Sequence, residues 1–587
     1  MCAICCQPIL GNRAYGKNHF SRLTNHTCGC KLCTEQIDLL PEILYIIMSY
    51  IDDARDFELN EKPFHLGFLP TEQSNPLTRN LDIEFRKSVT DGIRNLQQVD
   101  RNTLAMAEKI FPSPEFASLC DCIYRTLRNG NTVVFSGCGA TGRLSILLET
   151  MWRESCPEYA GLVKSIMTGG DFALVKSVES FEDHAVFGAR QVQDLGMRPD
   201  DLLVAITEGG ETSSVLGTVA GFTAAGGKAF LLFNNPAKLL KEHLERSRKA
   251  IENPRVTVLD LSCGPMAIAG STRMQATTCE QLIASAALET AARKLYGSGD
   301  APDFVSGFRD LLDALESDVT VKKMAAEITL EEDTYKSGGK VTYFADDYML
   351  DLFTDTTERS PTFMLPPFRK TDDTVSPEPW ALVKNPLYST ADTFRKVLGN
   401  RAFRCLEWKT ADYLAMSAPE KIRDNPPLIS AAELLKFPIG NEPLPSRCAS
   451  GKDAAVLFTY GSAPEKLQNA FASHAAPFAI RSTFDAALPQ VMPTGIRLFE
   501  HLAVKLQWNN ISTGTMVKLG RVSGNWMSFV AISNKKLIDR AIRLVSELGN
   551  IDYHTACVEL FRSRSENPGE PAVRCTLDRL GVKRGNQ

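Results

Sequence analysis

Residues 132–143 read Thr132-Val133-Val134-Phe135-Ser136-Gly137-Cys138-Gly139-Ala140-Thr141-Gly142-Arg143. The first four are β-branched or aromatic, which is typical of a buried strand, and a helix-length apolar stretch follows the glycines. The three glycines allow a tight turn, and the start of the helix offers unpaired N–H groups to an anion. The stretch therefore predicts a strand, a ligand-binding loop and a helix, which is the repeating unit of a parallel α/β sheet.

The same alternation of short apolar runs and helix-length stretches extends along the chain. Further strands are predicted at 163–167, 202–206, 229–233 and 256–259, with a fainter series at 340–344, 455–459 and 478–481. We therefore expect an α/β protein with two doubly wound parallel-sheet domains in tandem and a small helical C-terminal region. The expected segments are a Cys-rich N-terminal appendage (1–65), a helical segment that leads into the first sheet (66–118), the first domain (119–320), the second domain (321–534) and the C-terminal helices and tail (535–587).

Length, composition and charge exclude several classes of protein. The chain has 587 residues, which is about four times a common single-domain length. Hydrophobic residues make up 44% and charged residues 23%, as in ordinary globular proteins, and the net charge of -5 disfavours a non-specific nucleic-acid binder. The apolar run at 43–51 is much shorter than the roughly 18 to 20 residues that span a bilayer. We expect neither nucleic acid nor a membrane as a partner.

Six of the 16 cysteines lie within the first 33 residues, where no secretory signal is visible, and the other ten are scattered over the chain. We therefore expect a reducing, cytoplasmic compartment, with a nuclear location also open, and no disulfides. Cys2, Cys5, Cys30 and Cys33 have a spacing that suits tetrahedral zinc, and the alternative is a Cys-rich tail without metal. The segment 39–52 is similar to the opening helix of an F-box, which would suit an adaptor, although a plain amphipathic helix explains it as well.

Two later loops also combine glycines and hydroxyls before a helix. They are 207–214 and 270–274, and hydroxyls with N–H groups at helix starts bind phosphate or sugar oxygens. A phosphorylated, polyhydroxylated ligand is therefore expected. The Gly-x-Gly-x-x-Gly spacing also fits a dinucleotide, but no acidic residue stands at the end of the next strand to hold a ribose, so we expect no cofactor. The candidate ligand-binding residues are Gly139, Ala140, Thr141, Gly142, Thr212, Ser213, Ser271, Thr272 and Arg273.

Together these loops resemble those of sugar isomerase (SIS) domains, in particular the group of N-acetylmuramic acid 6-phosphate etherases and glucokinase regulatory proteins. The resemblance extends over residues 71–82, 137–144, 169–183, 270–274 and 512–525 in order, and 354–361 lies where a second SIS domain would have its own loop. It implies that Lys518 and Arg521 close over a sugar phosphate, whereas by themselves they are equally well explained as surface cations. The resemblance also implies that Glu182 acts as a base or contacts a sugar hydroxyl.

The resemblance leaves two functions open. Two SIS domains in one chain favour the regulatory protein, which binds fructose phosphates without turnover, so we expect a sugar-phosphate sensor or regulator that contacts a sugar kinase. The alternative is an enzyme, either an etherase-like lyase or an aldose–ketose isomerase. Etherase chemistry needs two carboxylates. The resemblance places one of them at Glu182, but the position of the other is occupied by Met151. Weak or absent etherase activity is therefore expected, unless Glu154, about one helical turn after Met151, supplies the second carboxylate. Glu154 is also explained as a solvated carboxylate on a helix.

Overall fold

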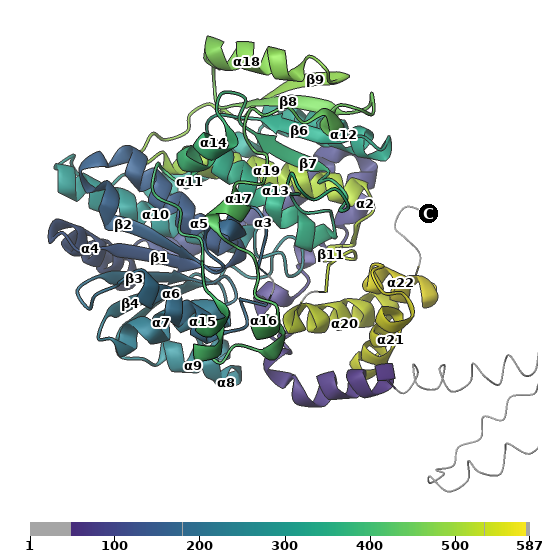
Figure 1. The fold of residues 1–587 in the computed structure, drawn as a ribbon, viewed down its shortest axis with the longest axis horizontal. Coiled ribbons are helices and arrows are strands. Elements are labelled where there is room, and N and C mark those ends of the chain that lie inside the picture. The colour runs from purple at the N-terminus through teal and green to yellow at the C-terminus, as the bar shows by residue number, and fades with distance from the viewer. Residues whose placement is uncertain (1–48, 179, 533, 583–587) are drawn as a thin grey trace, which may run out of the picture.

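Two parallel β-sheets organise the chain in a computed structural model that describes residues 49–178, 180–532 and 534–582 (Figure 1). The first sheet has the strand order β2-β1-β3-β4-β5 and the second has the order β7-β6-β8-β9. The first comprises β1 (Val133–Gly137), β2 (Val163–Met167), β3 (Leu202–Ile206), β4 (Lys228–Phe233) and β5 (Val256–Asp260). The second comprises β6 (Val341–Phe344), β7 (Ala381–Lys384), β8 (Ala454–Thr459) and β9 (Ile480–Asp485). The predicted α/β class with two parallel sheets is confirmed.

Helices cover both faces of the first sheet. Alternate side chains of β1 enter different cores: Val133 and Phe135 join the main core with α5 and α10, and Val134 joins a second core with α7. This division follows from the two-residue period of a strand and explains why β1 is apolar on both faces. The helices of this domain are α4 (Pro114–Arg128), α5 (Gly139–Ser155), α6 (Ala185–Asp194), α7 (Ser213–Ala224), α8 (Ala237–His243), α9 (Glu245–Ile251) and α10 (Gln275–Tyr296).

A layer of long helices joins the two sheets into one continuous hydrophobic core. It contains α2 (Leu81–Lys87), α3 (Val89–Ile110), α11 (Phe304–Glu316), α12 (Asp318–Lys336) and α19 (Leu498–Lys518). The second domain also contains α13 (Met349–Phe363), α14 (Thr390–Val397), α15 (Thr410–Ala415), α16 (Glu420–Asp424), α17 (Ala431–Leu434) and α18 (Glu465–Ala475). A two-stranded hairpin, β10 (Val522–Ser523) and β11 (Trp526–Met527), follows α19.

The second domain differs from the sequence prediction in two places. Residues 354–361, expected as its ligand loop, lie inside α13, and the loop that follows β6 is 345–348. The chain remains helical there because Pro361, the helix breaker of this stretch, falls only in the last turn. Strand β7 was not predicted, because its four residues stand beside a Pro-rich stretch that reads as a loop.

Three C-terminal helices, α20 (Lys535–Gly549), α21 (Tyr553–Glu566) and α22 (Ala572–Arg579), pack beside the first domain, and the helical residues 49–60 pack against them (Figure 1). Phe57 is buried, with its ring 6.0 Å from that of Phe561. Glu61 forms an ion pair with Lys535 at 2.7 Å. Residues 49–65, which we expected to belong to a separate appendage, are therefore part of the folded body. The four cysteines of the zinc hypothesis lie outside the described residues.

Truncation tests this revised boundary. Removing residues 1–65 is expected to lower the free energy of unfolding by about 3 kcal/mol or more relative to removing residues 1–48, because the longer deletion exposes the apolar surface that Ala54 and Phe57 cover. Urea unfolding of both truncated chains measures the difference. Equal midpoints would show that the 49–65 segment adds nothing to stability.

Within the described ranges, each helix is too short or too polar to cross a bilayer.

Candidate functional site

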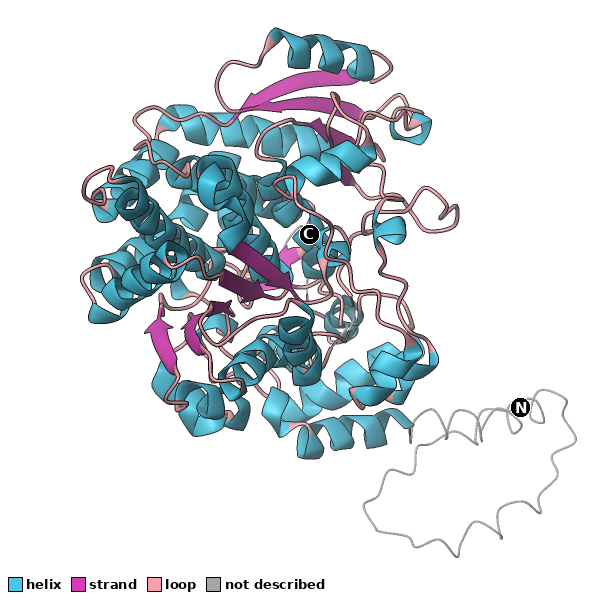
Figure 2. Ribbon diagram, turned by 60° about the vertical axis from the view of Figure 1, so that its left-hand side comes forward, coloured by secondary structure: helices cyan, strands magenta, loops and turns pink. Residues whose placement is uncertain are grey.

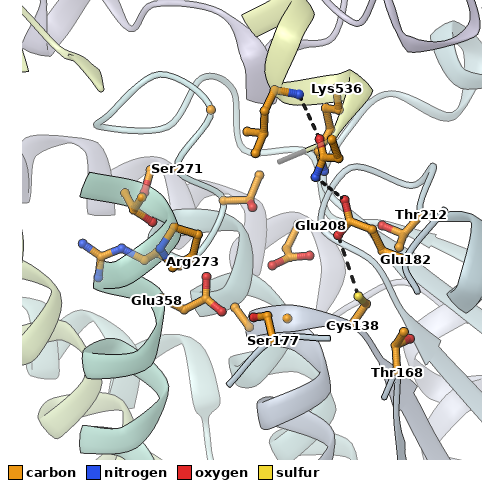
Figure 3. Close-up of a pocket in the computed structure, with 18 of the residues that line it drawn as sticks. Cys138, Thr168, Ser177, Glu182, Glu208, Thr212, Ser271, Arg273, Glu358 and Lys536 are labelled. Carbon is orange, nitrogen blue, oxygen red and sulfur yellow. Dashed lines mark hydrogen bonds between the residues drawn. The ribbon is translucent and has the colours of Figure 1, made fainter. Parts of the chain in front are cut away.

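A cavity of about 180 Å³ lies at the carboxyl end of the first sheet, where ligands of open α/β sheets bind (Figure 3). Four parts of the chain form it: the strand-to-helix loops of the first domain, α13 of the second domain, the segment from β11 to the loop after it, and the start of α20. The polar residues that line it are Thr168, Ser177, Ser180, Glu182, Glu208, Thr212, Ser271, Thr272, Arg273, Glu358, Thr362, Asn534, Lys536 and Arg540, together with Cys138.

Ser271 is the residue of the cavity lining whose hydroxyl most clearly suits a ligand. Its side chain is only 4% exposed, and its hydroxyl has no hydrogen-bond partner among the described residues, although it lines the cavity. The loop comes close to α20 because Gly270 has a φ of +75° and no side chain; a Cβ there would lie 2.3 Å from Nε of Arg540. Thr272 and Thr212 also line the cavity, as do Gly139 and Ala140 at the start of α5.

Two partly buried carboxylates of the first domain face the cavity (Figure 3). Oε1 of Glu182 accepts a hydrogen bond of 2.7 Å from Nδ2 of Asn534. Burial raises the pKa of Glu182, and the charge of Lys536 partly offsets this effect. Burial also raises the pKa of Glu208, to about 7, and the nearby carboxylates of Glu358 and Glu182 add to the shift. Near neutral pH Glu208 is therefore partly protonated and able to donate a proton.

The second domain contributes Glu358, which projects from α13 into the same space. This carboxylate forms an ion pair with Arg143, whose side chain is fully buried. The Nε and Nη2 groups of Arg143 donate to the carbonyl oxygens of Leu174 and Ala173 respectively, both at 2.9 Å. Arg143 thus fixes α13 against the glycine loop, and all three of these contacts are to protein atoms.

Lys536 brings a cation to the cavity from the first turn of α20. Its pKa is raised, because the carboxylates of Glu211 and Glu182 outweigh the effect of burial, so it is charged at neutral pH. Burial opposes ionisation of Glu211, but Lys536 and Arg246 hold its pKa at about 2. Sequence reasoning did not identify Lys536. A signal was available, because lysine in the first turn of a helix opposes the helix dipole and therefore needs another explanation.

Several predicted residues lie elsewhere. Glu154 forms an ion pair with Arg497 at 2.6 Å and does not face the cavity, so the geometry gives no support to its replacing a second acid there. Lys518 lies 3.8 Å from Glu332, and the guanidinium of Arg521 lies over the rings of Trp380 and Phe529, so neither closes over this cavity. Met151, at 1% exposure, belongs to the hydrophobic core.

Four other predicted residues reach the site only indirectly. Thr141 caps α5 internally, because its hydroxyl accepts from the N–H of Cys138 and donates to its carbonyl oxygen. Arg273 borders the cavity, but its guanidinium points away from it and pairs with Asp355 of the second domain (Figure 3). Gly142 packs against Met167, and Ser213 starts α7 on the side of another groove.

An arm of the second domain, residues 399–415, holds the loop that carries Glu182. Arg401 makes two hydrogen bonds of 2.7 Å to Asp171 and a third of 3.1 Å to Glu149. Arg404 makes two more to Glu149, at 2.7 and 2.8 Å. Asp171 begins the segment that leads to Glu182, so these pairs anchor that segment at its start.

The same arm supports this loop with an aromatic cluster. The ring of Trp408 stacks on that of Phe181, the neighbour of Glu182, with 6.1 Å between centroids, and Tyr413 packs edge-on against Phe181 at 6.3 Å. Nε1 of Trp408 donates to Asp194 at 2.7 Å. Figure 2 shows the long stretch of loops and short helices that connects the second domain to the region of the first sheet. The arm therefore makes the position of Glu182 depend on both domains.

The sequence is similar to two kinds of known protein. Residues 115–223 match the family described as the glucokinase regulatory protein N-terminal SIS domain. An N-acetylmuramic acid 6-phosphate etherase from Aliivibrio fischeri is 30% identical over 221 residues, which cover 37% of this chain and 67% of that protein. The etherase from Bacillus subtilis is 27% identical over 226 residues, which cover 38% of this chain and 68% of that one.

Solved structures with a related arrangement include the tagatose-6-phosphate ketose/aldose isomerase of Escherichia coli. It is 10% identical, and the alignment covers 76% of this chain and 98% of that one with a TM-score of 0.38.

Proposed function

The chain belongs to the group of SIS-domain proteins that contains the N-acetylmuramic acid 6-phosphate etherases and the glucokinase regulatory proteins, and from this premise we propose that the cavity of its first domain binds a hexose or amino-sugar phosphate. The observation that carries the proposal is the buried hydroxyl of Ser271, a residue that lines the cavity, since this hydroxyl has no partner in the described part of the chain. Leaving such a group unpaired costs about 1–3 kcal/mol, and a phosphate oxygen would remove that cost.

The charges around the cavity suit a ligand with an anionic end and a polyhydroxylated end. Lys536 and the start of α5 favour the phosphate, because cations and helix N-termini both stabilise anions. Glu182, Glu208 and Glu358 would repel a second anion, but they accept hydrogen bonds from sugar hydroxyls. We therefore place the phosphate near Ser271, Thr272 and Lys536 and the sugar ring against the carboxylates.

Replacing Lys536 by methionine tests this arrangement. We expect the affinity for glucosamine 6-phosphate to fall by about 10- to 100-fold, because a charge-assisted contact is worth about 1.5–3 kcal/mol. Isothermal titration calorimetry measures the change. Lys535→Met is the matched control, since the neighbouring Lys535 pairs with Glu61 and its side chain is 48% exposed. Equal losses in both variants, or none in either, would count against the assignment.

A lyase activity is the second candidate function, and the pair Glu182 and Glu208 favours it. In the elimination of a lactyl ether, a base removes the proton at C2, the electron pair forms the C2–C3 double bond, and the C3–O bond breaks. The ether oxygen then takes a proton from an acid. Glu182 would act as the base and Glu208, whose pKa is about 7, as the acid, in place of the carboxylate that the sequence lacks at Met151.

The comparisons favour this enzyme hypothesis over the regulator that the length of the chain first suggested. The curated relatives described above are etherases, and the match to the regulatory protein is confined to residues 115–223. Contact with a sugar kinase rests on that earlier expectation alone. The etherase hypothesis is also supported by Glu208, which is a second carboxylate beside Glu182 in the lining of the cavity.

A further inference from the structure

A second cavity, of about 360 Å³, lies next to the first, between the two domains. It is lined by the end of α13 and by the segment that leads into β7; both elements are labelled in Figure 1. Its walls are mainly apolar, formed by Val175, Pro361, Met364, Leu365, Pro366, Pro367, Phe368, Pro377, Pro379, Trp380, Ala381 and Ala531. Ser177 and Pro361 border both cavities. The second cavity differs from the first in its other walls, because it is lined by the segment 364–381, whereas the first is lined by the strand-to-helix loops of the first domain.

Two residues that line this cavity each carry a buried polar group without a partner among the described residues. They are the hydroxyl of Thr356, at 5% exposure, and Nη2 of Arg359, at 2% exposure. Buried donors are rarely left unpaired in native proteins, so two of them at one cavity need an explanation. The two neighbouring hydroxyls do have partners: Ser360 donates to the carbonyl oxygen of Leu365, and Thr357 donates to that of Leu174.

The charge of Arg359 limits what can bind. Its Nε donates to Asp355 at 3.0 Å and its Nη1 donates to Glu331 at 2.7 Å, so two carboxylates already balance the guanidinium. Lys176, which is exposed, is a second cation among the residues that line the cavity, so an anionic group is acceptable here, whereas an occupant without an acceptor would leave both donors unpaired. The surroundings therefore suit an apolar body with one small acceptor group. A carboxylate fits this description, because one oxygen can take a hydrogen bond from Nη2 of Arg359 and the other from the hydroxyl of Thr356.

We propose that this interdomain cavity is a second ligand site, which binds a small monocarboxylate with an apolar aromatic or aliphatic body. The carboxylate pairs with Arg359 and Thr356, and the body packs against Phe368, Trp380 and the prolines. The inference is independent of the sugar-phosphate proposal, since it rests on different residues and a different class of ligand.

Fluorine NMR of the full-length chain tests the proposal with two probes of similar shape, 4-fluorobenzoate and 4-fluorotoluene. We expect 4-fluorobenzoate to bind at millimolar concentration and at least about tenfold more tightly than 4-fluorotoluene, since only the carboxylate satisfies the two donors. Thr356→Val keeps the shape and removes one donor, so it is expected to weaken 4-fluorobenzoate binding by about tenfold. Thr354→Val is the matched control, because the hydroxyl of Thr354 already donates to the carbonyl oxygen of Leu350.

A second variant keeps the test decisive if the threonine changes have small effects. Ala531→Phe places a ring in the cavity from the loop before α20 and is expected to abolish binding of 4-fluorobenzoate. Three results would overturn the proposal: no binding of 4-fluorobenzoate to the native chain, equal affinity for both probes, or unchanged affinity in both Thr356→Val and Ala531→Phe while the variants remain folded.

Discussion

Replacing Arg401 by methionine is expected to lower the free energy of unfolding by about 3–5 kcal/mol. The side chain is 4% exposed and pairs with Asp171 and Glu149, which are themselves buried. Methionine fills much of the space but leaves Asp171 without its bidentate partner, and a buried carboxylate without a counter-charge is costly. Arg401 lies in the second domain, and its partners Asp171 and Glu149 lie in the first. Because these ion pairs join the two domains into one core, the loss of unfolding free energy should be large.

Urea unfolding followed by circular dichroism measures this effect, and Arg395→Met is the control. Arg395 pairs with Asp392 on the surface, where both side chains are more than half exposed, so its replacement should change stability by less than about 1 kcal/mol. A similar small change for Arg401→Met would show that the arm at 399–415 is not held by these pairs.

Glu182→Gln and Glu208→Gln are each expected to reduce lactate release from N-acetylmuramic acid 6-phosphate by about 100- to 10,000-fold, if the chain has etherase activity as proposed. The amide keeps the size of the side chain and removes its ability to take or give a proton. The two variants should differ in pH dependence. Glu208 must be protonated to act as the acid, so the native rate should fall as pH rises above about 7.

Enzymatic measurement of lactate provides the readout, and Glu154→Gln is the matched control, because its carboxylate pairs with Arg497 away from the cavity. This control should retain the native rate. A rate that depends on Glu154 but not on Glu208 would restore the acid that the sequence suggested. A native chain without activity that still binds the sugar phosphate would exclude the lyase hypothesis and favour the sensor.

The first sheet could be predicted from sequence because its strands are rich in apolar, β-branched and aromatic residues, and each is followed by a loop of turn-forming residues, such as the glycines after β1 and Asn234-Asn235-Pro236 after β4. The second sheet was harder to predict, since β7 has only Ala381–Lys384 and β9 (Ile480–Asp485) is largely exposed, which weakens the apolar pattern. The ligand loops of the first domain were identified for the same reason as its strands: they follow the strand ends directly.

The contributions of distant segments to the site could not be predicted in the same way. Glu358 and Lys536 reach the cavity from α13 and α20, and nothing in their local sequence specifies which part of the first domain they meet. Arg521 illustrates the opposite error. It lies near the end of the resemblance and carries the right charge, but the packing of β10 against α19 directs it towards Trp380.

The most direct test of the sugar-phosphate assignment is calorimetric titration of the native chain and of the double variant Ser271→Ala/Thr272→Ala. The ligands are glucosamine 6-phosphate, fructose 6-phosphate and N-acetylmuramic acid 6-phosphate. Glucosamine and fructose serve as unphosphorylated controls. We predict that the native chain binds at least one of the phosphates and neither control, and that the double variant loses that binding, because two contacts to the phosphate are removed at about 1.5–3 kcal/mol each. Undiminished binding by the double variant, or equal binding of a sugar with and without its phosphate, would contradict the account.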